Sequence, residues 1–263
     1  MTISLCPKKN NPTKKTSLIL FDLDGTLLDS HKRISDRNME AITECRRHDI
    51  IIGVATARNE ATCSRFTDII KPELVISNSG ALVRVNGRVI YQRGFTAVET
   101  AALIGAGLAQ RRGITVDCAD VTFSNRHIPF FNEPGMEYTD FSGFSLDSFK
   151  VCIEGTETEF AKRTAALVEN CSWQAFSDCE WFKFSKAGVS KGDALRHVVK
   201  HTGIPTEEMI AFGDDFLDIE MLDICGTGIA MSNSPEEVKL HADITIGNND
   251  SDAIADFLYG CVL

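Results

Sequence analysis

The chain has 263 residues, of which 43% are hydrophobic and 24% are charged, and this length allows one large domain or a domain with an insertion. Its formal net charge of −10 argues against broad binding to nucleic acid or to anionic membranes, because both need a basic surface. No apolar run is long enough for a transmembrane helix and no secretory apolar segment precedes the first core strand, so we expect a cytoplasmic protein. We also expect a monomer or a weak dimer.

The first third of the chain alternates between short apolar runs and helical patterns. Apolar residues 18–21, 50–55 and 74–76 are interpreted as buried strands. Helices are predicted from Ser35 and over residues 58–69. Strands separated by helices are typical of parallel βαβ units with right-handed crossovers.

The pattern changes after Gly80, where Asn86-Gly87 between two apolar runs predicts a hairpin with a type I′ turn. Capping boxes that begin at Thr96 and Thr156 predict two helices. Further short strands are predicted at residues 114–118, 121–125, 149–153, 173–176 and 181–184. A region rich in hairpins with two helices indicates a separate α+β module inserted into an α/β chain.

The alternation of strands and helices resumes at Ser190, a predicted helix N-cap, and a strand at residues 209–212 ends in Gly213-Asp214-Asp215. Strands at residues 228–231 and 243–246, with helices between and after them, complete the chain. We therefore predict an α/β fold with a doubly wound, Rossmann-like parallel sheet and an inserted α+β cap. The predicted core comprises residues 1–82 and 187–263, and the predicted cap comprises residues 83–186.

Polar side chains follow the predicted strands at the point where each strand ends. Asp22 and Asp24 follow the first strand at positions i and i+2, so both can face one site at the carboxyl edge, where open α/β sheets bind ligands. Thr56 and Asp214 follow two other strands, and Lys191 opens the helix after the inserted module. Paired acids at the end of a buried strand need compensation, for which Mg²⁺ is suited. Phosphoryl transfer needs such a set: a nucleophile, an acid and cations.

Four short motifs, in this order, resemble those of the haloacid-dehalogenase-like phosphatases: Asp22-x-Asp24-Gly25-Thr26, Thr56, Lys191 and Gly213-Asp214. The chain is similar to the Cof-type branch of that family, in which a cap lies between the second and third motifs. Supporting stretches are Asn78-Ser79-Gly80-Ala81, Val189–Leu195, Gly228–Met231 and Ala242-Asp243. The resemblance implies a Mg²⁺-dependent phosphatase that acts on a small phosphorylated metabolite, such as a sugar phosphate.

The resemblance also implies a role for each motif residue. Asp22 would be the nucleophile and a Mg²⁺ ligand, and Asp24 would be the general acid/base and bind Mg²⁺ through its backbone carbonyl. The Thr56 hydroxyl and the Lys191 ammonium would bind phosphoryl oxygens, and Asp214 would be the third protein ligand of Mg²⁺. For Thr56 an alternative is the N-cap of the following helix.

Two positions depart from the family pattern. Leu217 stands where the family often has Asn in Gly-Asp-x-x-Asn-Asp, and Ser79 stands at the Asn of Asn-Gly-Ala. Both departures bear on rate and substrate fit, although neither removes a primary role. We expect Asp218 to hydrogen-bond near the metal, toward Lys191. Asp215 either supplies the polar contact that Leu217 lacks or caps the next helix.

Other polar groups have weaker signals. Asn125, Arg126 and His127 lie at a predicted strand end in the cap and are candidates for substrate contacts, with a solvated loop as the alternative. His197 and His201 lie four apart on one helix, but without an H-E-x-x-H pattern they are interpreted as surface or packing residues. Aromatic residues that could line a pocket or pack in the core are Phe130, Phe131, Tyr138, Phe141 and Phe144.

Three other functions share parts of this set of residues. A phosphomutase would reuse the aspartyl-phosphate and release an isomer in place of free phosphate. A phospho-acceptor signalling module of the receiver type also uses clustered acids, Mg²⁺, Thr and Lys, but it needs neither the cap nor the separate acid Asp24. A catalytically weak phospho-ligand-binding protein is suggested by Leu217.

Overall fold

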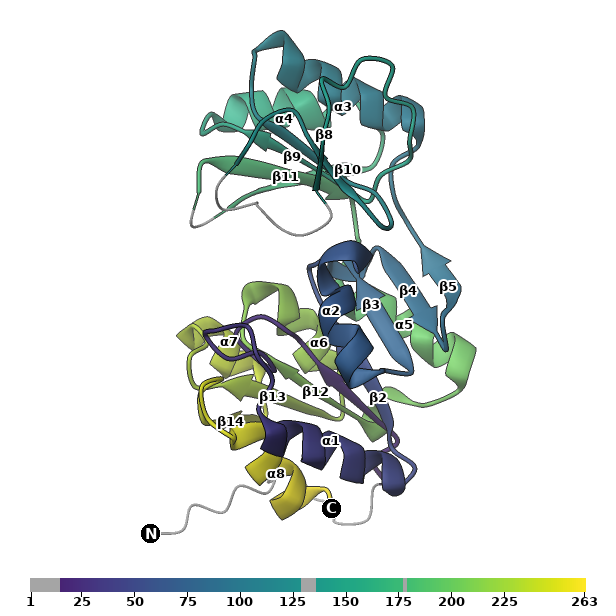
Figure 1. The fold of residues 1–263 in the computed structure, drawn as a ribbon, viewed down its shortest axis with the longest axis vertical. Helices are drawn as coiled ribbons and strands as arrows, with labels where there is room; N and C mark the ends of the chain where they lie inside the picture. Colours follow the sequence, from purple (N-terminus) through teal and green to yellow (C-terminus); the bar gives the residue numbers. More distant parts are fainter. Residues whose placement is uncertain (1–14, 129–135, 177–178) are drawn as a thin grey trace. The chain divides into compact units, whose positions relative to one another are not determined.

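The computed structural model of the chain describes residues 15–128, 136–176 and 179–263. These residues form two compact units (Figure 1). Unit 1 comprises the chain up to Ala57, Thr67–Tyr91 and Ser190–Leu263, and unit 2 comprises Arg58–Phe66 and Gln92–Val189. The chain therefore leaves unit 1 twice: briefly for Arg58–Phe66, and then after Tyr91 for the long insertion that ends before Ser190.

Unit 1 is built on an eight-stranded sheet with the order β14-β13-β12-β1-β2-β3-β4-β5. The strands from β14 to β3 run parallel, and β4 pairs antiparallel with β3. Leu18 of β1 lies opposite Met209 of β12 on one side and Ile51 of β2 on the other. The strands are β1 (Leu18–Phe21), β2 (Ile51–Ala55), β3 (Leu74–Ser77), β4 (Leu82–Val85), β5 (Arg88–Gln92), β12 (Met209–Gly213), β13 (Thr227–Met231) and β14 (Ile244–Ile246).

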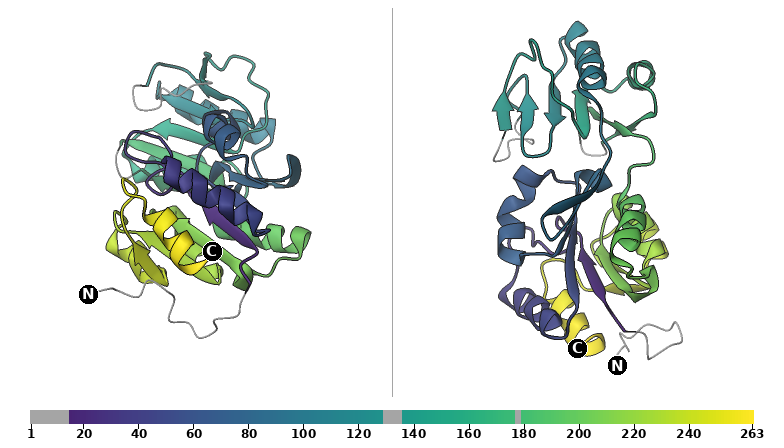
Figure 2. Two further views of the ribbon diagram at one scale, coloured as in Figure 1. Left: turned by 60° about the horizontal axis from the view of Figure 1, so that its bottom comes forward. Right: turned by 90° about the vertical axis from the view of Figure 1, so that its right-hand side faces the viewer.

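Helices cover both faces of this sheet, as the right-hand view of Figure 2 shows. They are α1 (Asp36–Arg47), α5 (Lys191–Thr202), α6 (Ile219–Ile224), α7 (Glu236–His241) and α8 (Ala253–Cys261). A further helix, α2 (Glu60–Ile70), begins in the unit 2 segment Arg58–Phe66 and ends in unit 1. Leu18 and Leu20 pack with Leu195 of α5 in one apolar cluster. On the other face Phe212 stacks on Phe21 and contacts the ring of Phe257 in α8. Both faces are buried, which explains why these strands are continuous apolar runs.

Unit 2 contains a six-stranded sheet with the order β10-β11-β9-β6-β7-β8, antiparallel except for the β7–β8 pair. Its strands are β6 (Ile114–Asp117), β7 (Thr122–Ser124), β8 (Met136–Tyr138), β9 (Lys150–Glu154), β10 (Cys171–Ala175) and β11 (Trp181–Lys186). Its helices are α3 (Ala97–Ala109) and α4 (Thr158–Ala165). Val116, Val151 and Phe184 pack with Leu103 and Phe160 of these helices in one apolar core.

Local sequence signals were confirmed at three places. Thr96 caps α3 in a reciprocal capping box with Glu99. Asn86 and Gly87 have φ angles of 48° and 76°, as a type I′ turn requires. The Ser190 hydroxyl accepts a hydrogen bond from the backbone N–H of Asp193 and so caps α5.

The capping box predicted at Thr156 was wrong. Glu157 is the N-cap of α4 and makes no side-chain capping bond, and the helix ends at Ala165. The Glu157 carboxylate instead pairs with Arg112, 3.1 Å away, and accepts a hydrogen bond from the backbone N–H of Thr156. A tertiary ion pair has thus replaced the local cap. Within the described ranges, no helix combines the length and apolarity needed to cross a membrane.

Candidate active site

Three neighbouring strands of the unit 1 sheet bring the predicted motif residues to its carboxyl edge. Asp22 follows β1, Thr56 follows β2 and Asp214 follows β12, and β1 lies between the other two strands. The backbone N–H of Asp22 donates to the carbonyl of Phe212, 3.0 Å away, which extends the β1–β12 pairing to the first acid. Parallel pairing therefore collects polar groups from distant parts of the sequence at one edge.

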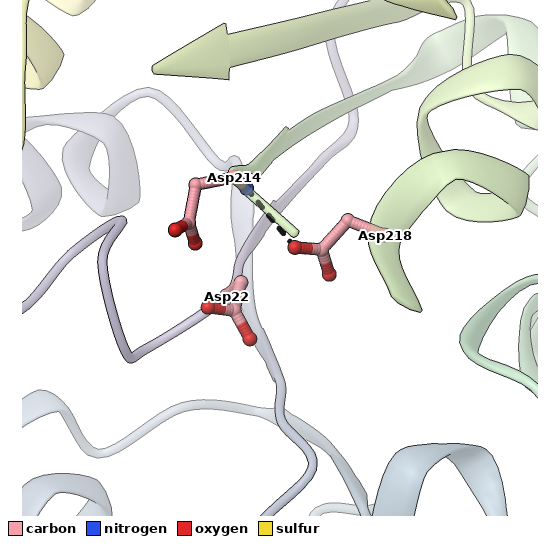
Figure 3. Close-up of side chains that lie close together, drawn as sticks. All are labelled: Asp22, Asp214 and Asp218. Carbon is pink, nitrogen blue, oxygen red and sulfur yellow. Dashed lines mark hydrogen bonds between the residues drawn. The ribbon is translucent and has the colours of Figure 1, made fainter. Parts of the chain in front are cut away.

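Three carboxylates meet at this edge. Asp22, Asp214 and Asp218 each offer an oxygen, and these oxygens lie within 4.8 Å of one another (Figure 3). It is the one group of at least three potential metal-ligating side chains found among the described residues. Asp218 lies in the short helix η4 (Phe216–Asp218), so η4 adds a third acid to the two from strand ends. Oxygen-rich sets of this kind suit Mg²⁺.

Lys191 lies within this group of acids and is 2% exposed. Its Nζ donates to Asp22 Oδ1 and to Asp218 Oδ1, both at 2.5 Å. A cation is disfavoured at a helix N-terminus, so the two carboxylates compensate both the burial and the helix dipole. Burial alone would lower the pKa of Lys191, but the charges of Asp218 and Asp22 outweigh it and hold that pKa above its usual range. The lysine is therefore a fixed positive charge.

The acids carry more negative charge than Lys191 can balance. Burial raises the pKa of Asp22 well above its usual value, and the neighbouring carboxylates of Asp218 and Asp214 raise it further, against the opposing charge of Lys191. Burial also raises the pKa of Asp214 to about 7, although a hydrogen bond from Thr26 opposes the shift. Three acids facing one lysine leave an excess of negative charge, which fits a divalent cation.

Two glycines allow the acids to approach one another. A Cβ on Gly25, whose φ is +79°, would lie 2.2 Å from Asp214 Oδ2. A Cβ on Gly213 would lie 2.6 Å from the Cβ of Asp218. The Thr26 hydroxyl donates to Asp214 Oδ1 at 2.8 Å, which fixes that carboxylate. The strand-end turns are thus packed too closely for any larger residue at these two positions.

Hydrogen bonds from the η4 turn and from the end of β13 support the same turns. The second oxygen of Asp218 accepts from the backbone N–H groups of Asp214 and Asp215, at 3.0 and 3.1 Å. Asn233 Nδ2 donates to the carbonyl of Gly25 at 2.8 Å and lies 3.5 Å from Asp214 Oδ2. The motif analysis did not identify Asn233. It is a polar residue just after the end of β13, as Asp22, Thr56 and Asp214 are just after the ends of their own strands.

The other motif residues are placed as follows. Asp24 lies outside the group of clustered acids, and its Oδ1 pairs with Lys32 Nζ at 2.6 Å, with both side chains partly exposed. Thr56 is 1% exposed. The N-cap role at α2 is taken by Asn59, whose Oδ1 accepts from the N–H of Thr62 at 2.9 Å. Asp215 is exposed and accepts from the N–H of Phe216, so it caps η4.

Ser79, the departure from Asn-Gly-Ala, lies in the turn after β3. Its backbone N–H donates to the carbonyl of Thr56 at 3.0 Å, so this turn is fixed beside the end of β2. Asn78 and Ser79 both have left-handed φ angles, 52° and 58°. Ser79 Oγ and both polar atoms of the Asn78 side chain are buried without a hydrogen-bond partner in the described part of the chain. The serine thus adds no visible contact to the acids or to Lys191.

The candidate substrate residues of unit 2 have partners within that unit. Asn125 bonds the backbone N–H of Ile114 through Oδ1, and the carbonyl of Arg112 through Nδ2, each at 2.9 Å. Arg126 pairs with Glu154. His127 is exposed, and its Nδ1 lies 3.1 Å from the hydroxyl of Tyr138. Asn125 therefore uses both ends of its amide on the backbone.

Aromatic and histidine side chains mostly pack within the units. Phe141 belongs to the apolar core of unit 2, and its ring meets Phe144 edge to face at 5.3 Å. The ring of His197 stacks on Tyr91 with a centroid distance of 3.7 Å, while His201 is exposed. Neither histidine belongs to the one potential metal group of the described residues. The two remaining aromatic candidates lie outside the described residues: Phe130 and Phe131.

Comparison with known proteins places these features in context. A family model described as haloacid dehalogenase-like hydrolase matches residues 19–258 of the chain. The 5-amino-6-(5-phospho-D-ribitylamino)uracil phosphatase YcsE of Bacillus subtilis is 28% identical over 263 residues, which cover 94% of this chain and 96% of that protein. Endoribonuclease YBEY, chloroplastic, of Arabidopsis thaliana is 27% identical over 272 residues, covering 93% of this chain but 46% of that protein. The chain thus spans about half the length of the Arabidopsis relative.

Solved structures show the same fold. A haloacid dehalogenase-like hydrolase from Bacteroides thetaiotaomicron matches with a TM-score of 0.83 and 22% sequence identity, covering 93% of this chain and 99% of that one. At this identity the likeness concerns the fold alone. It confirms the predicted α/β class, a parallel sheet flanked by helices with an inserted α+β module.

Proposed function

This chain belongs to the haloacid dehalogenase-like hydrolase family, and from that premise we propose that it is a Mg²⁺-dependent phosphatase of a small phosphorylated metabolite. One observation carries the proposal: the buried Lys191 ammonium lies 2.5 Å from Asp22 Oδ1 and from Asp218 Oδ1, with Asp214 in the same cluster. A phosphoryl group needs a nucleophile beside fixed positive charge, and this arrangement supplies both.

Asp22 is the nucleophile in the proposed reaction. Its carboxylate oxygen attacks phosphorus, the bond from phosphorus to the leaving oxygen breaks, and Asp24, after taking up a proton from solvent, donates that proton to the leaving oxygen. The Asp24 carboxylate then takes a proton from water, which attacks the aspartyl-phosphate and releases inorganic phosphate. Asp24 must leave Lys32 to do this, and an ion pair between partly exposed side chains is weak enough to break.

Lys191 and Thr56 bind the phosphoryl oxygens in this scheme. Lys191 is held by two carboxylates, so its charge is already oriented before substrate arrives and costs no reorganisation during the reaction. Thr56 is fixed by its own backbone, because its N–H donates to the carbonyl of Ile76 at 2.8 Å and its carbonyl accepts from Ser79 at 3.0 Å. Both groups therefore have defined positions at the sheet edge.

Mg²⁺ would be held by Asp22, Asp214 and the backbone carbonyl of Asp24. The donor set fits the ion, since the clustered carboxylates are hard oxygen ligands with uncompensated negative charge. When bound, Mg²⁺ neutralises charge that develops on the phosphoryl oxygens. Asp218 holds Lys191 and the backbone of Asp214, so it supports both the cation and a metal ligand.

We assign substrate choice to unit 2, as the cap of this enzyme. One face of its sheet is apolar and covered by helices. Side chains at the alternate strand positions lie on the opposite face, and the polar ones among them can recognise the leaving group of the substrate. YcsE is named for a substrate that carries a phosphorylated ribityl chain. On this basis we propose a phosphorylated sugar or sugar alcohol as the substrate class.

Phosphate release from a panel of sugar phosphates, sugar-alcohol phosphates, nucleotides and cofactor phosphates, with and without Mg²⁺, tests the proposal. We expect Mg²⁺-dependent release by the native chain and a loss of at least ~10³-fold in Asp22→Asn, which keeps the shape of the side chain but removes the nucleophile. Asp68→Asn, at an exposed position in α2, is the matched control and should behave as the native chain. Activity retained in Asp22→Asn would exclude the proposed nucleophile, and an isomeric product in place of phosphate would identify a mutase.

A further inference from the structure

The first turn of α5 is held by a polar network that extends well beyond Lys191. The Ser190 hydroxyl accepts from the N–H of Asp193 at 2.9 Å and donates to the Glu220 carboxylate. Arg196 binds both acids, Asp193 Oδ1 at 3.2 Å and Glu220 Oε1 at 2.9 Å. The turn that carries Lys191 is therefore held in place by hydrogen bonds and an ion pair to Glu220 of α6.

Close packing reinforces this fastening. A Cβ on Gly192 would lie 2.4 Å from the Glu220 side chain, so a glycine is needed for α6 to approach this turn. Asp218, two residues before Glu220, binds Lys191 itself. A single segment of chain, from η4 into α6, thus contacts both the lysine and the turn that presents it.

Tyr91 is attached to the same turn from β5. Its hydroxyl donates to Asp193 Oδ2 at 3.2 Å. Its ring stacks on His197 at a centroid distance of 3.7 Å and an interplanar angle of 19°, and His197 Nε2 lies 3.9 Å from Asp193 Oδ2. Two contacts of different kinds, a hydrogen bond and a ring stack, therefore join Tyr91 to successive turns of α5.

Tyr91 and Ser190 flank the long insertion that forms most of unit 2. Tyr91 is the last residue of unit 1 before the chain enters unit 2, and Ser190 is the first after the chain returns. Tyr91 binds Asp193, and Ser190 caps the same helix. Both ends of the long insertion Gln92–Val189 are thus tied to one helical turn, the turn that begins with Lys191.

We propose that Tyr91 is a positioning residue, which acts through Asp193 to set the first turn of α5 and hence the Lys191 ammonium, so that the junction with unit 2 is coupled to phosphoryl binding. The inference rests on the proposed function, because it assumes that Lys191 binds the phosphoryl group. It predicts that removing the Tyr91–Asp193 hydrogen bond weakens phosphate binding, although Tyr91 belongs neither to the cluster of Asp22, Asp214 and Asp218 nor to the proposed phosphate ligands.

Tyr91→Phe tests the coupling, because it removes the hydroxyl and keeps the ring stack on His197. A hydrogen bond of ordinary net strength corresponds to about a three- to tenfold change in affinity. We expect the Kd for inorganic phosphate, measured calorimetrically with Mg²⁺ present, to rise by that factor, with KM rising in parallel and kcat changing less. Tyr259→Phe, at an exposed tyrosine of α8, is the matched control and should leave all three unchanged.

Two further measurements separate positioning from simple packing. If Tyr91 acts through Asp193, the effects of Tyr91→Phe and Asp193→Asn on the Kd for phosphate will not add in the double variant. A lower melting temperature with an unchanged Kd for phosphate, or effects that add fully, would overturn the proposal. Phosphate binding is measured independently of turnover, so a native chain that binds phosphate but hydrolyses no ester would contradict the proposed function and still test Tyr91.

Discussion

The two sheets of this protein place their charged residues in different ways. In unit 1 the central parallel strands β1 and β12 are apolar along their length, and the charges stand just after their ends, at Asp22 and Asp214. In unit 2 the charges lie within the sheet, where Asp117 of β6 is paired in register with Lys150 of β9 and their side chains meet at 2.6 Å. A parallel sheet covered on both faces can carry chemistry only at its edge, whereas an antiparallel sheet with one apolar face can carry it across the other.

The surroundings of the two lysines follow from this difference. Lys191 is 2% exposed and binds two carboxylates. The side chain of Lys150 is 19% exposed, and its partner Asp117 also accepts a hydrogen bond from Thr122 at 2.9 Å. Losing Lys191 leaves a concentrated charge without compensation, while losing Lys150 leaves an acid that keeps another partner.

Replacing each lysine by methionine should show this contrast most strongly. Lys191→Met should lower the free energy of unfolding by about 3–5 kcal/mol and abolish phosphate release, because buried carboxylates lose their cation. Lys150→Met should cost about 1–3 kcal/mol, since Asp117 keeps its bond to Thr122. Urea unfolding at pH 8 measures both values, and equal losses in the two variants would refute the contrast.

The pH dependence of stability should come mainly from the unit 1 edge. The pKa of Asp214 is about 7 in the folded protein, above its ordinary value of 3.8, so between these values the folded state binds more protons than the unfolded state. Without metal, the free energy of unfolding should therefore fall as the pH rises from 5 to 8, by at most ~1.4 kcal/mol per pH unit for one proton. Mg²⁺ should offset the fall, because it binds the ionised carboxylate.

Urea unfolding at several pH values, with and without Mg²⁺, measures this dependence. Asp214→Asn is the informative variant, because its amide cannot ionise and it should therefore reduce the slope of the pH profile of the metal-free protein, while Asp22, whose pKa burial also raises, keeps its own contribution. A native profile that rises from pH 5 to pH 8 without metal would contradict the assignment.

Two buried thiols can report on the units separately, with a smaller expected effect. Burial raises the pKa of Cys225, in unit 1, to about 12 and the pKa of Cys152, in unit 2, to about 11. Both thiols should therefore react slowly with a thiol reagent in the native protein. Mg²⁺ with phosphate should slow the labelling of Cys225 a few-fold and leave Cys152 unchanged, because the ligands bind unit 1. Mass spectrometry of the labelled protein assigns each rate to its own residue among the nine cysteines, and equal protection of Cys225 and Cys152 would show that the units open together.

Much of the fold follows from signals that are local in the sequence. Asn86-Gly87 and the N-cap Ser190 were predicted because their backbone geometry depends on their own neighbours. The family resemblance, carried by four short motifs, was confirmed by the family model. These motifs could be found from the sequence because each lies at a strand end or a helix start, which local pattern reveals.

What the sequence did not predict depends on contacts between distant segments. The cap at Thr156 failed because Arg112, from another part of unit 2, engages Glu157. The contribution of Asn233 to the Gly25 turn joins residues 208 positions apart, and no periodicity reports such a contact. The roles proposed for Asp22, Asp24, Thr56, Lys191 and Asp214 stay predictions, which variants at these positions and their kinetics can test.

The inserted unit has a consequence for how this protein folds. The central β1–β12 pair joins Leu18 to Met209, so the unfolded chain must close a long loop to form the middle of its sheet. The ends of the insert already lie together within unit 2, where Arg93 Nη1 is 3.7 Å from the position that a Cβ would take on Gly188. If the insert folds first, it holds its two ends close together. The loop between β1 and β12 then contains fewer unfolded residues, less entropy is lost when it closes, and the larger sheet forms faster.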